Sequence, residues 1–225
     1  MRKNGLITLE AIKNNTVVNE YMARGNEFIG NIGAIEHNQK HAELVSFLSY
    51  DILNSLGYSQ REAELAAIAG YLHDIGNLVN RYSHGLSGAI MVLEVLMGMN
   101  MDPEEIAVIL AAIGNHEEHA DGQSVNPVAA AVILADKSDV HQTRVRKRES
   151  SCFTIRDRVN YAAKESALLV DDEKKVITLR LRIDTGTCSV MEYFEIFLTK
   201  MLMCKRAAEF LGCQFELLIN DVKLL

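Results

Sequence analysis

Proline is rare in this chain, with only Pro103 and Pro127 among 225 residues, so few positions are barred from helices. Long apolar runs are absent as well. No stretch of about 20 uninterrupted apolar residues occurs, which excludes a helix that spans a bilayer. The segment from Met1 to Leu9 contains Arg2 and Lys3 but no apolar core, so we expect no signal peptide or transit segment.

Cysteine and positive charge are also limited. The four cysteines have no C-x-x-C spacing and no secretory context, so we expect buried or free thiols in a reducing cytoplasm. The formal net charge of −7 disfavours general binding to nucleic acids or anionic membranes. The chain has no G-x-S-x-G motif and no reactive-looking Cys-His pair, and so no recognisable serine or cysteine nucleophile. Apolar residues, by contrast, make up 48% of the chain, which is enough for a packed core.

Residues 1–150 carry the pattern of an all-helical domain. From His41 to Leu56, for example, apolar residues recur at three- and four-residue spacing. Several segments also open with helix start signals, such as the capping box Ser59–Glu62 and an Asp or Asn that precedes proline. The expected helices begin near Thr8, His41, Ser59, His84, Asp102 and Asn126.

The pattern changes in residues 151–225. Lys175–Asp184 alternates between apolar and polar residues, which predicts a half-exposed strand, and Gln214–Ile219 alternates again. Between them a capping box at Ser189 opens a helix that runs to Leu211. We therefore expect a mainly α fold, a helical bundle with a small C-terminal α/β appendage of strand, helix and strand. The helix is apolar on much of its circumference, so it lies either inside the fold or in a subunit interface, and a homodimer is possible.

Histidine and aspartate gather within the helical part. His73 and Asp74 end an apolar segment just before a glycine, and mixed His and Asp ligands on a rigid support suit a divalent metal. Asp136 interrupts an apolar helix, where a carboxylate needs a cation or a hydrogen-bond donor because burying it unpaired is costly. The other candidates are His41, His84 and His116.

Other polar residues near these candidates have two interpretations. His37 is four residues before His41 on the predicted helix, and His119 follows His116; whether either joins the site stays open. Lys137 and Arg144 are well placed to hold phosphate oxygens, because arginine offers a bidentate fork. The ordinary interpretation of His84 and His116 is that of polar residues at helix ends.

The order of His41, His73-Asp74 and Asp136 resembles the HD phosphohydrolase superfamily, whose metal motif H…HD…D lies on a bundle of helices. The resemblance covers about residues 31–148. The sequence His-Asp-Ile-Gly at 73–76 is similar to the HDIG variant of the motif, and Ala-Asp-Lys at 135–137 is similar to the terminal segment of the family.

The resemblance implies an HD-type helical bundle that holds one or two divalent transition metal ions (Fe, Mn, Zn, Ni or Co). Asp74 would be the catalytic residue, as a ligand that bridges the ions, and His84 and His116 are similar to the extra histidines of two-metal members. Lys137 and Arg144 would bind the substrate. The implied metal ligands are His41, His73, Asp74, His84, His116 and Asp136.

The implied function is that of a cytoplasmic phosphohydrolase. Such an enzyme would cleave a phosphate ester or anhydride of a nucleotide or other small molecule with a metal-bridged water. The spacing from His73 to His84 is similar to that of small two-metal members that cleave nucleoside polyphosphates. The alternative is a regulatory binding module, in which the metal site is structural and the C-terminal unit binds a partner.

Overall fold

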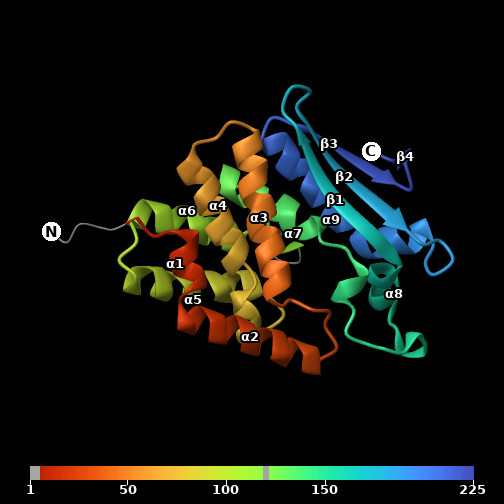
Figure 1. Cartoon of the computed structure of the whole chain (residues 1–225), viewed down its shortest axis with the longest axis horizontal. Coiled ribbons are helices and arrows are strands. Elements are labelled where there is room, and N and C mark those ends of the chain that lie inside the picture. Colours follow the sequence, from red (N-terminus) through yellow and green to blue (C-terminus); the bar gives the residue numbers. More distant parts are fainter. Residues whose placement is uncertain (1–5, 119–121) are drawn as a thin grey trace.

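The computed structural model describes residues 6–118 and 122–225. The fold is mainly α, with a four-stranded sheet near the C-terminus, and this confirms the expected fold class (Figure 1). The helices up to the middle of the chain are α1 Leu9–Lys13, α2 Thr16–Asn31, α3 Gln39–Ser55, α4 Gln60–Leu72, α5 His84–Gly98, α6 Pro103–Gly114 and α7 Pro127–Ser138. Short 3-10 helices follow α4 (η1, Ile75–Leu78) and α7 (η3, Gln142–Arg144).

The predicted helix starts are made by side-chain caps. The Ser59 side chain accepts a hydrogen bond from the Glu62 backbone N–H, and the Glu62 carboxylate accepts one from the Ser59 backbone N–H, which completes the capping box of α4. Asp102 and Asn126 cap α6 and α7, each ahead of a proline. These caps occupy backbone N–H groups that a helix leaves without partners in its first turn.

Helix α7 lies at the centre of the helical part, packed against α3, α4, α6 and α9. Its residues 129–135 have no solvent exposure, and four of these seven residues are alanine. Small side chains let neighbouring helices approach closely, so the last turn of α7 lies deep in the molecule. Asp136 stands on that last turn.

The C-terminal sheet has the strand order β1-β2-β3-β4. Strands β2 and β3 are parallel and are joined by the crossover helix α9, which confirms the predicted strand, helix and strand. The structure adds an antiparallel hairpin partner, β1, and a short edge strand, β4. The bounds are α8 Ile155–Ala162, β1 Ala163–Asp171, β2 Val176–Ile183, α9 Val190–Phe210, β3 Gln214–Ile219 and β4 Val222–Lys223.

Helix α9 lies between the sheet and α7, as Figure 1 shows. Its buried side includes Tyr193, Phe197 and Met201, so of the two alternatives the position inside the fold is observed for this side. An outer stripe of Met191, Leu198 and Leu202 stays exposed, and the homodimer remains a prediction. Within the described residues, no helix combines the length and apolar character needed to cross a bilayer.

Candidate metal centre

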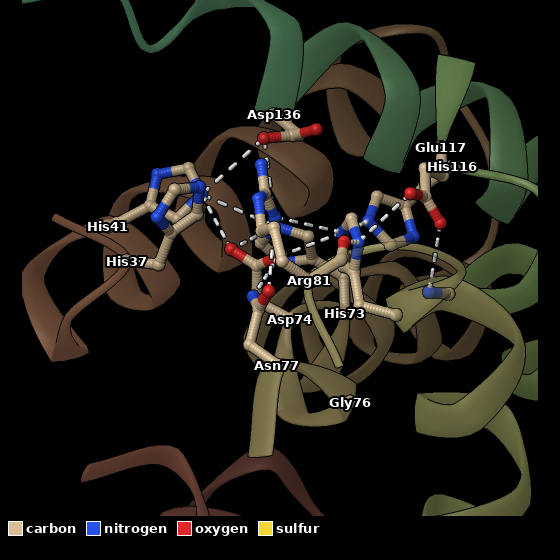
Figure 2. A network of polar contacts seen from close by, with 12 residues as sticks. His37, His41, His73, Asp74, Gly76, Asn77, Arg81, His116, Glu117 and Asp136 are labelled. Carbon is tan, nitrogen blue, oxygen red and sulfur yellow. Dashed lines mark hydrogen bonds and ion pairs between the residues drawn. The ribbon is translucent and has the colours of Figure 1, made fainter. Parts of the chain in front are cut away.

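The structure brings the six predicted ligands together at one place. They come from α3, from the end of α4, from the start of α5, from the segment after α6 and from the last turn of α7. Figure 2 shows the Asp74 carboxylate between His41 on one side and His116 on the other. The residues fall into groups in which one donor atom from each member lies within 4.8 Å of the others. The members are His41, His73, Asp74, His84, His116 and Asp136.

The first group has the spacing of a metal coordination shell. The His41 Nε2 atom lies 3.4 Å from Asp74 Oδ2, 3.4 Å from Asp136 Oδ1 and 3.3 Å from His73 Nε2. His73 Nε2 in turn lies 3.3 Å from Asp74 Oδ2 and 3.6 Å from Asp136 Oδ1. Ligands about 2.1 Å from one ion are separated by roughly 3.0–3.5 Å, so each of these separations is close to that between two ligands of one cation.

A second group adjoins the first through Asp74. The other carboxylate oxygen, Oδ1, lies 3.2 Å from His84 Nε2, which lies 3.0 Å from His116 Nε2. The Asp74 Oδ2 atom is buried and accepts no hydrogen bond. A buried carboxylate oxygen without a donor is costly unless a cation meets it. The residues therefore fit a metal, and Asp74 belongs to two of the ligand groups.

Hydrogen bonds at the far side of each ring aim the histidines at the centre. The Nδ1–H groups of His73, His84 and His116 donate to the backbone carbonyl three residues earlier, at 2.8, 2.9 and 2.6 Å. His41 Nδ1 lies 2.6 Å from Asp139 Oδ2. With its proton on Nδ1, each ring can present the Nε2 lone pair to a metal ion, as a neutral histidine ligand requires.

Asp139 and Arg144 form a support behind His41. The Arg144 NH1 group donates to Asp139 Oδ2 at 2.8 Å, and its Nε donates to the Glu36 carbonyl. Arg144 NH1 also lies 2.9 Å from His41 Nδ1. We assign a proton to Nδ1 that it donates to Asp139, because an ionised carboxylate can only accept and this tautomer leaves Nε2 free for a metal. Burial opposes ionisation of Asp139, but Arg144 and His41 outweigh it and lower the pKa of this carboxyl to about 2.

Replacing Asp139 by asparagine should destabilise the protein by about 3 kcal/mol, because it leaves the buried Arg144 charge without a counter-charge. Since the pKa of Asp139 is lowered from 3.8 to about 2, its stabilisation is complete above the higher value and is lost as the pH falls to the lower one. Urea unfolding at pH 7 measures the difference in free energy of unfolding between wild type and variant. The same measurement repeated from pH 4 to pH 2 should show that difference becoming smaller.

The matched control is Asp171→Asn, which removes an exposed ion pair to Lys174 and should leave the free energy of unfolding unchanged within error. Equal stability of Asp139→Asn and the wild type at pH 7 would contradict the role given to this pair.

Glu117 contacts His84 and accepts hydrogen bonds at the N-terminus of helix α5. The residue before that helix, Ser83, has a left-handed backbone and no side-chain cap. The Glu117 carboxylate accepts hydrogen bonds from the backbone N–H groups of Ser83 and Gly85 and lies 3.2 Å from His84 Nδ1. Burial would raise the pKa of Glu117, but His84 and the Gly85 N–H lower it to about 2. Glu117 is therefore an anion that caps α5 from outside.

The glycine of the His-Asp-Ile-Gly sequence allows η1 to touch α5. A Cβ atom on Gly76 would lie 2.0 Å from the His84 carbonyl oxygen and 2.5 Å from the Gly88 nitrogen. Any side chain would push the two segments apart and separate Asp74 from His84. Asn77, the next residue, donates from Nδ2 to Asp74 Oδ1 at 2.9 Å and holds that carboxylate in place.

Asp136 forms an ion pair, as expected for a carboxylate in an apolar helix. Lys137 Nζ lies 2.7 Å from Asp136 Oδ2 and 2.7 Å from Glu118 Oε2. Burial opposes the charge on Lys137, but the two carboxylates outweigh it and raise its pKa. Asp136 thus has one oxygen on a lysine and the other facing the histidines.

The carboxylates of Asp74 and Asp136 favour positive charge around His73, where the first ion would lie. Burial opposes protonation of His73, but Asp74 and Asp136 raise its pKa to about 10. Farther along, burial and the neighbouring cations His84, His73 and Lys137 lower the pKa of His116 to about 3, which keeps that ring neutral. The field that holds a proton on His73 would equally hold a metal ion.

Two predictions about neighbouring residues have different outcomes. The expectation that His37 shares a helix face with His41 is wrong, because α3 begins at Gln39 and Asn38 caps it. His37 nevertheless lies near the centre, with its ring 5.7 Å from that of His41. His119 lies outside the described residues.

Sequence reasoning assigned no role to several residues around the centre. Asp139 and Glu117 support His41 and His84 from positions distant in the sequence, so no local spacing reveals them. Arg81 lines the same pocket as Asp74, with NH1 4.0 Å from Asp74 Oδ1. Lys137 and Arg144 line it too, although each is held by carboxylates, and their contact with substrate stays a prediction.

Comparison with known proteins agrees with this geometry. The family model of the HD domain matches residues 39–158, more than half of the chain. An uncharacterised protein of Methanocaldococcus jannaschii, MJ1020, is 26% identical over 195 residues, which cover 76% of this chain and 74% of that protein. HD domains bind divalent metals and are generally metal-dependent hydrolases. By its family match, the chain belongs to the HD domain family.

Proposed function

We propose that this protein is a phosphohydrolase that cleaves a phosphate ester or anhydride of a nucleotide or another small molecule. The observation that carries the proposal is the position of Asp74, which contributes one oxygen to each of two adjacent ligand groups and lines a pocket. A carboxylate in that position can hold two cations side by side, and hydrolysis of phosphate esters uses such pairs.

The ligand set limits the metals that would fit. Four histidines and two aspartates favour iron, manganese, zinc, nickel or cobalt over magnesium, which prefers oxygen ligands. His41, His73, Asp74 and Asp136 would hold the first ion, and Asp74, His84 and His116 the second. When bound, such ions neutralise charge on a phosphoryl group and lower the pKa of water.

The chain itself supplies the binding of the phosphate. Arg81 and Arg144 line the pocket beside the centre, and a guanidinium group can bind two phosphate oxygens at once. Lys137 orients Asp136 through a 2.7 Å contact and adds positive charge to the same wall. These residues would orient the phosphoryl group against the metal ligands.

The pocket also favours an enzyme over a regulatory module with a structural metal. Structural sites are closed by their protein ligands, whereas catalytic sites keep an open position. Here Asp74, His84 and Asp136 all line the pocket wall, so a substrate can reach the ligand groups.

Purified protein reconstituted with manganese or iron should retain the metal after desalting and hydrolyse p-nitrophenyl phosphate or a nucleotide. Removing the metal with a chelator should abolish turnover, because the phosphoryl charge and the water then lack a Lewis acid. Elemental analysis and release of product measure the two effects. Adding the metal back should restore the rate. Protein that retains no transition metal, or that turns over equally well without it, would refute the proposal.

A further inference from the structure

The pocket at the metal centre is completed by the C-terminal unit. Helices α8 and α9 contribute part of the pocket wall, although neither provides a metal ligand among the described residues. Four residues of these helices line the pocket, namely Arg156 and Asn160 on α8 and Phe197 and Lys200 on α9. All but Phe197 have polar or cationic ends with few partners.

Asn160 presents a hydrogen-bond acceptor without a donor. Its side chain has no solvent exposure, its Nδ2 group donates to the Arg156 carbonyl at 2.9 Å, and its Oδ1 atom has no partner. The contact with a carbonyl fixes which end is Nδ2, because the reverse orientation would place two acceptors together. A buried acceptor of this kind is costly unless a donor reaches it, and Asn160 lines the pocket.

Lys200 presents a cation that is only loosely paired. Its Nζ lies 3.7 Å from Glu118 Oε1, beyond hydrogen-bond distance, and 5.0 Å from the centre of the Phe197 ring. The side chain is 17% exposed. Burial lowers the pKa of Lys200 to about 8, so the group is still mainly cationic at pH 7. A desolvated ammonium group with spare donors on a pocket wall favours an anion.

Arg156 adds a second cation to the same wall. No carboxylate within the described part of the chain forms an ion pair with its guanidinium group, in contrast to Arg144 and Lys137 across the pocket. The two cations and the amide oxygen together match a ligand that carries both an anionic group and a hydrogen-bond donor.

We propose that Arg156, Asn160 and Lys200 form a second subsite, which binds the part of the substrate remote from the phosphoryl group that is cleaved. This inference rests on the proposed function and narrows the substrate. The substrate would carry a second phosphoryl group, held by Arg156 and Lys200, and a hydroxyl or N–H group that donates to Asn160 Oδ1. Helices α8 and α9 then determine which phosphate compound reaches the metal ligands.

Titration calorimetry on the metal-loaded protein tests the anionic part of the subsite. The probes are orthophosphate, which has one phosphoryl group, and methylenediphosphonate, which has two and is not hydrolysed. Wild type should prefer methylenediphosphonate, and Lys200→Met should reduce that preference about tenfold without changing the affinity for orthophosphate. Metal content is measured before and after, because the probe also binds metals.

The controls lie on the same helix. Lys205→Met removes an exposed lysine of α9 and should leave the preference unchanged, while Lys200→Arg should restore most of it. An unchanged preference in Lys200→Met, or no preference in wild type, would overturn the anionic subsite. Hydrolysis of p-nitrophenyl phosphate by wild type is measured separately. Absence of hydrolysis of both this ester and a nucleotide would remove the proposed function, whereas the titrations would still decide whether the subsite exists.

Asn160→Leu tests the donor part of the subsite. The probe is adenosine 5′-(α,β-methylene)diphosphate, which has the same two phosphorus groups plus hydroxyl and amino donors. The variant should bind this probe about tenfold more weakly and bind methylenediphosphonate as before. The melting temperature without ligand should stay equal or rise, because a buried acceptor without a donor has been removed. A lower melting temperature with equal loss of both probes would mean that Asn160 is only structural.

Discussion

Replacing Asp74 by asparagine should lower the rate of phosphate-ester hydrolysis by about a thousandfold or more, because cations at such sites stabilise the transition state by several kcal/mol. The substitution keeps the size of the side chain but removes the charge, and it weakens the donor atoms that face both ligand groups. We expect less than one ion per chain by elemental analysis, and a turnover number close to the background.

The control is Asp51→Asn on α3, which changes one carboxylate outside the ligand groups and should leave metal content and rate unchanged. Circular dichroism of both variants should match that of wild type. A rate for Asp74→Asn within a few-fold of wild type would contradict the bridging role proposed for Asp74.

Replacing His84 by alanine should reduce the metal content from about two ions to about one, with a steep loss of activity. His84 belongs only to the group with Asp74 and His116, so the variant keeps His41, His73, Asp74 and Asp136. His73→Ala should have the wider effect, because His73 belongs to the first group and also lies in a group with His116 and Asp136. Elemental analysis of the two variants side by side separates these expectations.

His141→Ala is the matched control, because His141 lies outside the ligand groups and contacts Thr143 and the Lys164 carbonyl. It should keep wild-type metal content and activity. Equal metal content and full activity in His84→Ala would indicate a single-ion site, and His84 would then be only the first residue of helix α5.

The fold was predictable where the signal was local. Caps at Ser59, Asp102 and Asn126 are complete within four residues of sequence, and the alternation of β2 and β3 is visible without any neighbour. Strand β1 was missed because its outer face is only half-buried, so apolar and polar residues do not alternate cleanly. Its place is set by pairing with β2, which is a property of the sheet and not of the segment.

The site was predictable as a set of residues but not as an arrangement. The order of histidines and aspartates indicated which side chains meet, and the structure brings those six together. The placement of His37 on the same helix as His41 was wrong, because Asn38 caps α3 and the helix begins only after His37. Asn160 and Lys200 could not be placed, since their approach to the HD residues depends on how α8 and α9 pack on the helical part.

The hydrogen bonds behind the histidine rings imply an order in which the centre would fail. His73, His84 and His116 are each oriented by a carbonyl three residues away, so a single turn of chain preserves their aim. His41 is oriented by Asp139, from which it is separated by 98 residues. A local opening between α3 and the segment after α7 would therefore release His41 alone, while its three companions stayed aligned. We therefore expect the ion beside His41 to be lost before global unfolding, and the ion held by His84 and His116 to be retained longer than the first.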